Sequence, residues 1–170
     1  ADLTPEQLKS LTALQRGDSS QFALLAAEAK TQQQAMLSYQ LGQWLRQQQR
    51  GAEAQEWLSL ARDFDTLRFR APQEINRQIK GFVDNKTVWL VDAEQALRDH
   101  SPDGLIGRQL MLEHLHPNLP GYFVIADAFY QALAKSQQLP AYAVTVEKAK
   151  AWALRPVVPA EEFAAFARVA

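Results

Sequence analysis

Residues 35–65 have the sequence AMLSYQLGQWLRQQQRGAEAQEWLSLARDFD, and they decide the fold class. Large apolar residues recur at helical spacing on both sides of Arg50-Gly51, so the stretch predicts two amphipathic helices joined by a glycine turn. Gly42 lies inside the first of these helices, where a glycine costs about 1 kcal/mol relative to alanine. We therefore expect a neighbouring helix to pack closely against Gly42.

The same stretch resembles one tetratricopeptide-repeat (TPR) unit. The resemblance is carried by Tyr39-Gln40-Leu41-Gly42, the turn at Gly51, Glu53-Ala54 and the later Ala61. Only one convincing copy is present, whereas a solenoid of such units needs about three. An ordinary helical hairpin is the alternative interpretation of the same residues.

Helices are also predicted on both sides of this hairpin. Thr4-Pro5-Glu6-Gln7 is a typical helix start, with Thr4 as the N-cap, Pro5 at the first helical position and Gln7 three residues after the cap. Apolar periodicity predicts further helices at residues 72–84, 93–98, 122–135, 145–153 and 160–169. In the helix at 72–84 we expect Ile75, Ile79, Phe82 and Val83 to face inward.

One stretch departs from the helical period. Residues 87–92, Thr-Val-Trp-Leu-Val-Asp, are β-branched or apolar on both faces, which predicts a short buried strand. A lone strand leaves its backbone donors and acceptors unpaired. We therefore expect partner strands from a missing N-terminal part of a larger α/β protein, or self-association of two copies through the 87–92 strand.

Composition excludes several classes of protein. The 170 residues are 47% hydrophobic with a net charge of −1, which indicates a globular chain without the basic face of a nucleic-acid-binding protein. No apolar run reaches the roughly 20 residues of a membrane span. The absence of cysteine excludes disulfides, thiolate metal sites and cysteine nucleophiles. None of these features assigns a cellular compartment.

The candidate chemistry lies in Glu113-His114-Leu115-His116-Pro117-Asn118, just before a predicted helix. A histidine titrates near neutral pH and therefore suits a general base. A carboxylate beside it selects the tautomer and stabilises the charged imidazole. On a tight turn, Glu113 and His116 are able to point to the same side, while Asn118 is placed to cap the following helix.

This block resembles the last conserved block of SGNH (GDSL-type) hydrolases, which carries Asp-x-x-His, and the wider chain resembles bacterial proteins that combine an SGNH domain with TPR-like helices. The resemblance covers about residues 35–135. Its residues are Ala61-Arg62-Asp63, Leu67 to Pro72, Val91-Asp92, Asp103-Gly104, Gly107 and Glu113 to His116.

The resemblance implies that His116 is the catalytic base and Glu113 the acidic member, although the family usually has Asp at the second position. His114 and Asn118 would be supporting residues, and no cofactor or metal is implied. The family's nucleophile lies in Gly-Asp-Ser after a buried strand. Here Gly17-Asp18-Ser19 follows a helical pattern, so we interpret it as a helix stop and the N-cap of the next helix.

Three alternatives remain for these residues. Glu113, His114 and His116, with His100, could form a metal site, although their spacing is not the helical His-x-x-x-His pattern. The histidines could instead form a structural hydrogen-bonded cluster. Finally, the TPR-like helices with Trp44 and Trp57 could present a surface to a protein partner without any catalysis.

The sequence therefore predicts a mainly α chain, with helical hairpins and one short strand near residues 87–92, that is a fragment of a larger α/β protein. A helical, TPR-like segment occupies residues 1–71, and a C-terminal SGNH-like segment occupies residues 72–170. The expected function is to supply the histidine and acid of an ester or acetyl hydrolase, with no activity in this chain alone.

Overall fold

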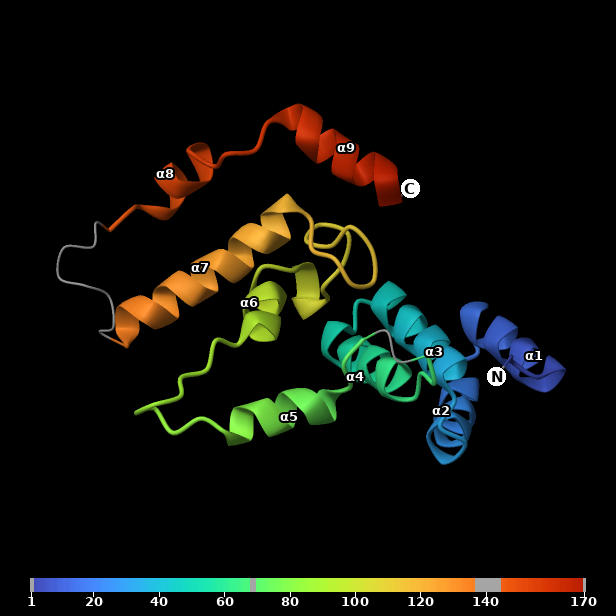
Figure 1. Cartoon of the computed structure of the whole chain (residues 1–170). Coiled ribbons are helices and arrows are strands. Elements are labelled where there is room, and N and C mark those ends of the chain that lie inside the picture. Colours follow the sequence, from blue (N-terminus) through green and yellow to red (C-terminus); the bar gives the residue numbers. More distant parts are fainter. Residues whose placement is uncertain (1, 68–69, 137–144, 170) are drawn as a thin grey trace. The chain divides into compact units, whose positions relative to one another are not determined.

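A computed structural model describes residues 2–67, 70–136 and 145–169. The chain divides into two compact units, Ala1–Ile79 and Lys80–Ala170, and each is described by itself (Figure 1). The described residues are mainly helical, which confirms the predicted α class. The predicted boundary between residues 71 and 72 stays a prediction.

The first unit consists of consecutive helices, each packed chiefly on the next one along the chain (Figure 1). The first four helices form two helical hairpins with matching spacing along the chain. The first helices of the hairpins begin at residues 5 and 35, and the second helices begin at residues 21 and 51. The helices are α1 (Pro5–Gln15), α2 (Gln21–Thr31), α3 (Ala35–Gln47) and α4 (Gly51–Asp63).

The start of α1 confirms the predicted capping box and anchors a polar network. The Thr4 hydroxyl accepts a hydrogen bond from the Gln7 amide, and the Gln7 side chain accepts one from the Thr4 amide. Gln7 is only 2% exposed, and its side-chain NH₂ donates to Glu28 and Gln34, both at 2.7 Å. The start of α1 is thereby joined to the end of α2 and to the connection that follows it.

The core of the first unit is densest between α3 and α4. A methyl group added at Gly42 would lie 2.8 Å from the Leu58 side chain, which confirms the close helix packing expected at this glycine. Trp44 and Trp57 are buried, and the Phe22 ring lies 5.4 Å and 6.0 Å from their rings. The two tryptophans are therefore core residues and do not line an exposed partner surface.

The second unit has a smaller core. Leu97 and Val124 pack with Leu110 of the intervening loop, and Ala96, Ile106 and Ile125 cover them. The helix α5 spans the boundary between the two units. The elements from there on are α5 (Gln73–Gly81), α6 (Ala93–Asp99), the 3₁₀ helix η1 (Pro102–Gly104), α7 (Leu119–Lys135), α8 (Lys148–Ala153) and α9 (Pro159–Val169).

The predicted strand at residues 87–92 is wrong, since these residues form an extended loop and no strand occurs in the described ranges. Asp84 explains the difference. Its carboxylate accepts hydrogen bonds from the amides of Lys86, Thr87 and Val88, so these donors are not available to a ladder. Trp89 is 40% exposed. Self-association through a strand at 87–92 therefore loses its structural basis.

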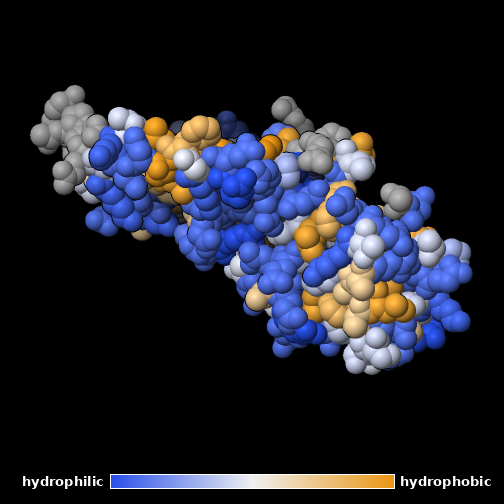
Figure 2. Space-filling view, turned by 90° about the horizontal axis from the view of Figure 1, so that it is seen from below, coloured by the Kyte–Doolittle hydropathy of each residue, from blue (hydrophilic) through white to orange (hydrophobic). Residues whose placement is uncertain are grey.

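The predicted inward face of the helix at 72–84 is also wrong. No residue of α5 is buried, and Ile75, Ile79 and Phe82 are all exposed. Apolar side chains likewise reach the surface elsewhere, in separate patches between polar residues (Figure 2). Amphipathic periodicity predicted the helix correctly, but it could not show whether a neighbour covers the apolar face.

Candidate functional site

The Glu113–His116 block lies at the tip of a hairpin-like loop in the second unit. Met111 and Pro117 form an isolated antiparallel bridge. Inside it, the Leu112 amide donates to the His116 carbonyl at 2.8 Å. These backbone contacts close the chain around residues 113–116 and bring side chains three residues apart to one side of the loop.

Asn118 joins this loop to the start of α7. Its side-chain oxygen accepts a hydrogen bond from the Gly121 amide at 3.0 Å, and its NH₂ donates to the Arg108 carbonyl at 3.0 Å. The Asn118 amide also donates to the Leu110 carbonyl at 2.9 Å. The predicted capping role of Asn118 is therefore confirmed, and this buried side chain positions the loop.

The carboxylate of Glu113 is the centre of the candidate site. One oxygen contacts Nδ1 of His116 and accepts the His116 amide at 2.9 Å. The other oxygen accepts the Leu115 amide at 2.8 Å and lies 2.8 Å from Nδ1 of His114. Glu113 therefore organises both histidines as well as the backbone of its own turn.

These contacts control the ionisation of Glu113. Partial desolvation raises its pKa, but the His116 side chain, the amides of Leu115 and His116 and the nearby His114 lower it by more. The resulting pKa is about 2, well below the usual 4.5. The carboxylate is consequently ionised throughout the neutral range, as an acid that orients a histidine must be.

His116 combines a fixed side with an open side. Its Nδ1 faces Glu113, while its side chain as a whole is 62% exposed. Within the described part of the chain, no serine, threonine or tyrosine hydroxyl forms a hydrogen bond with His116. The Nε2 atom is therefore open to a group brought from outside this loop.

The loop should respond to acid in a defined window. Because the pKa of Glu113 is lowered on folding, its ionised form stabilises the turn above about pH 4.5, and this contribution is lost as pH falls toward 2. We expect the Leu115 and His116 amide resonances to shift with a midpoint near pH 2 in an NMR titration. The variant Glu113→Gln should show no such transition, and a midpoint near pH 4.5 would contradict the assigned contacts.

The Gly17-Asp18-Ser19 segment is a helix stop, as predicted, but its predicted role as the N-cap of the next helix is wrong, because Ser20 is at the N-cap position of α2 and makes no side-chain cap hydrogen bond. Gly17 has a φ of 104°, which is a left-handed conformation that favours glycine. The Gly17 amide donates to the Leu14 carbonyl and the Asp18 amide donates to the Ala13 carbonyl, which together form a Schellman motif after α1. Ser19 lies in this turn and not on a strand-to-helix elbow.

The metal interpretation gains no support from the geometry. Across the described ranges, no three His, Asp or Glu side chains are arranged to hold a metal ion. His100, which the alternative set included, places Nδ1 on the Ala96 carbonyl and Nε2 near Lys148.

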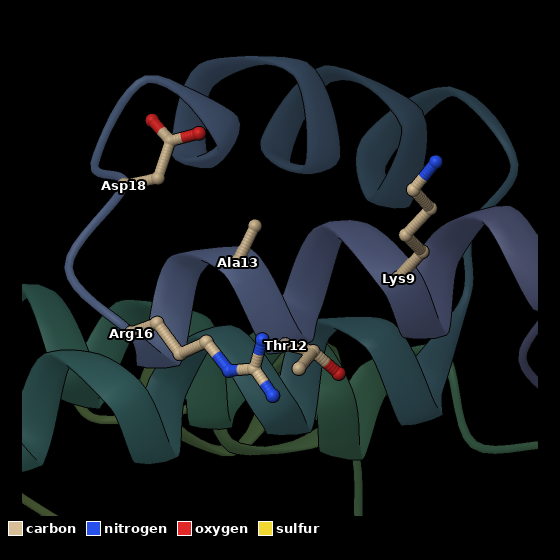
Figure 3. A pocket seen from close by; sticks show the side chains of 5 residues that line it. All are labelled: Lys9, Thr12, Ala13, Arg16 and Asp18. Atoms are coloured by element: carbon tan, nitrogen blue, oxygen red, sulfur yellow. The ribbon is translucent and has the colours of Figure 1, made fainter.

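An open groove on α1 was not predicted from the sequence. Lys9, Thr12 and Ala13 of α1 and its C-cap residue Arg16 line the groove, and Asp18 lies at its end (Figure 3). In the part of the chain that the structure describes, neither Lys9 nor Arg16 forms an ion pair. Their spacing of two helical turns was the available signal, but exposed cations at that spacing are common on solvated helices.

Comparisons with protein-family models, with curated proteins and with solved structures gave no match. In the described ranges, no helix has both the length and the apolar character needed to cross a bilayer.

Proposed function

We propose that Glu113 and His116 are the acid and base of an SGNH-like serine ester or acetyl hydrolase. The contact between the Glu113 carboxylate and Nδ1 of His116 carries this proposal. It is the contact by which a triad carboxylate holds the imidazole with Nε2 directed toward the nucleophile. The exposed position of the His116 ring leaves Nε2 accessible.

The proposed reaction proceeds through an acyl-serine. Nε2 of His116 accepts the serine proton while the serine oxygen bonds to the ester carbonyl carbon. The protonated imidazole, stabilised by Glu113, then gives this proton to the departing alcohol as the ester bond breaks. A water molecule attacks the acyl-serine in the same way and releases the acid, which restores the free serine.

The nucleophile belongs, in this proposal, to a part of the parent protein outside this chain. Ser19 is a poor candidate because it lies in the turn that ends α1 and not on a strand-to-helix elbow. The chain alone is therefore expected to be inactive. TPR-like helices in the first unit, and the description of the chain as a fragment, remain parts of the same proposal.

The test uses the complete gene product that contains this segment. We expect it to hydrolyse p-nitrophenyl acetate and to lose roughly 10²–10⁴-fold in kcat with His116→Ala. The control is His114→Ala, because His114 contacts the same carboxylate but has no part in the proton transfer. A complete protein that hydrolyses the ester equally well with His116→Ala would overturn the proposal.

A helical module that binds a protein partner is the second candidate function. The observation that favours it is the groove of Figure 3, in which Lys9 and Arg16 accompany the apolar surface of Ala13. Such a lining suits a partner segment that combines apolar and acidic residues. The two functions differ in their dependence on His116, since partner binding by the first unit should survive His116→Ala unchanged.

A further inference from the structure

The helix α7 packs on its neighbours with two of its faces. On one face, Val124 and Ile125 join the core cluster that includes Leu97 of α6. On a second face, the Phe123 ring meets Trp152 of α8 edge-on at 4.9 Å, and Asp127 pairs with Lys148 at 2.8 Å. Figure 1 shows α7, in orange, beside α6, while the ring contact and the ion pair place α8 against the second face of α7.

The third face of α7 is apolar and exposed. Tyr122, Phe129 and Leu133 are 54%, 52% and 47% exposed, and Ala126 between them is exposed as well. These residues follow one another at intervals of four, three and four. Because that is the spacing of a heptad seam, the side chains form one stripe along about three turns of the helix. We call these four residues the α7 stripe.

The spacing determines what kind of surface fits the stripe. A seam with intervals of three and four receives side chains from another helix, which insert between its own in knobs-into-holes packing. A strand or an irregular loop does not match this period. The partner surface is therefore a helix with an apolar stripe of its own.

The charge of α7 permits that partner to be another α7. From Leu119 to Ala134 the only charged residue is Asp127. Asp127 lies on the face toward α8, and Lys148 neutralises it. Two copies of the α7 stripe are therefore able to meet without like charges facing each other across the seam.

The order of side-chain sizes in the stripe is self-complementary. When two copies run antiparallel about a two-fold axis, Ala126 of one copy faces Phe129 of the second copy, and Tyr122 faces Leu133. The small Ala126 then provides the space that the large Phe129 ring fills. In a parallel arrangement, like residues would meet and leave Ala126 opposite itself with an unfilled gap.

We propose that this protein forms an antiparallel homodimer through the α7 stripe. This self-association differs from a strand-mediated one and goes beyond the proposed hydrolase function, because it uses neither residues 87–92 nor the Glu113–His116 pair. Four residues per copy bury less than the roughly 1,200 Å² of a standard interface. We therefore expect a weak dimer, with a Kd on the order of 10 μM.

The test is sedimentation velocity of the full 170-residue chain at concentrations from roughly 1 to 300 μM, a range that brackets the expected Kd. The wild-type chain should change from monomer to dimer across this range. Ala126→Glu and Phe129→Lys should each weaken dimerisation at least roughly 10-fold, because each places a charge in the apolar seam. An equimolar mixture of the two variants should recover a dimer, since the two new charges then face each other across the seam.

The matched control is Phe163→Lys, which changes another exposed phenylalanine, on α9. It should leave dimerisation unchanged. Ala126→Glu and Phe129→Lys are both at exposed positions, so the circular dichroism spectra of these variants should remain those of the wild type. Leu133→Glu is a third variant at an exposed position of the same stripe. A wild-type chain that stays monomeric at the highest concentration, or a dimer that survives all three stripe variants, would overturn the proposal.

Discussion

Gly121→Ala is expected to unfold the second unit or to destabilise it by about 3 kcal/mol or more. The added methyl group would lie 2.0 Å from the Leu110 carbonyl oxygen and 3.0 Å from Cβ of Pro117. The backbone at Leu110 has little freedom to move away, because its carbonyl accepts the Asn118 amide. The substitution therefore forces apart the loop and the helix start that Asn118 joins.

This prediction is measured by chemical denaturation followed by circular dichroism, together with the NMR signals of the loop. Gly81→Ala is the control, because an added methyl group at Gly81 meets no atom within 4 Å. The control should change the free energy of unfolding by less than about 1 kcal/mol. Equal unfolding midpoints for Gly121→Ala and the wild type would contradict the close approach of α7 to the loop.

Trp57→Ala is expected to destabilise the first unit by about 3–5 kcal/mol. Trp57 is only 7% exposed, and its ring meets Phe22 nearly at a right angle. The Lys30 ammonium also lies 5.1 Å from the ring centre and adds a cation–π contact. Removing the indole leaves a cavity between helices that are already in close contact and cannot fully collapse.

Trp89→Ala serves as the matched control, since Trp89 lies on the exposed loop after α5. Its free energy of unfolding should change by less than about 1 kcal/mol. Thermal and urea unfolding of both variants would measure the difference. If the two substitutions cost the same, Trp57 would not be the core residue that its burial indicates.

The helices were predictable because their signals are local. The capping box of Thr4 and Gln7, the stop at Gly17 and the cap at Asn118 each involve residues within a few positions of one another. Gly42 was informative for a related reason. A glycine inside a helix lowers its stability relative to alanine, so it is expected where a neighbouring helix packs too closely for a larger side chain. The structure identifies Leu58 as the residue that approaches Gly42.

The candidate pair was also accessible from the sequence, because Glu113 and His116 are only three positions apart and a closed turn brings them together. The role of the turn itself was not accessible. The Glu113 carboxylate holds two backbone amides as well as the imidazole, which becomes visible only when the loop conformation is known. The Glu113–His116 chemistry therefore remains a proposal, and the catalytic assay of the complete protein is its test.

Local patterns in the sequence thus determined where most helices lie and how they start and stop, since capping and periodicity depend on neighbours in the chain. Only the tertiary structure decided which apolar faces are covered. The apolar run at residues 87–92 lies in a loop whose first two amides, those of Thr87 and Val88, donate to Asp84, and α5 keeps Ile75 and Ile79 exposed. Burial depends on which distant segments meet, and the period of a single segment carries no information about its neighbours.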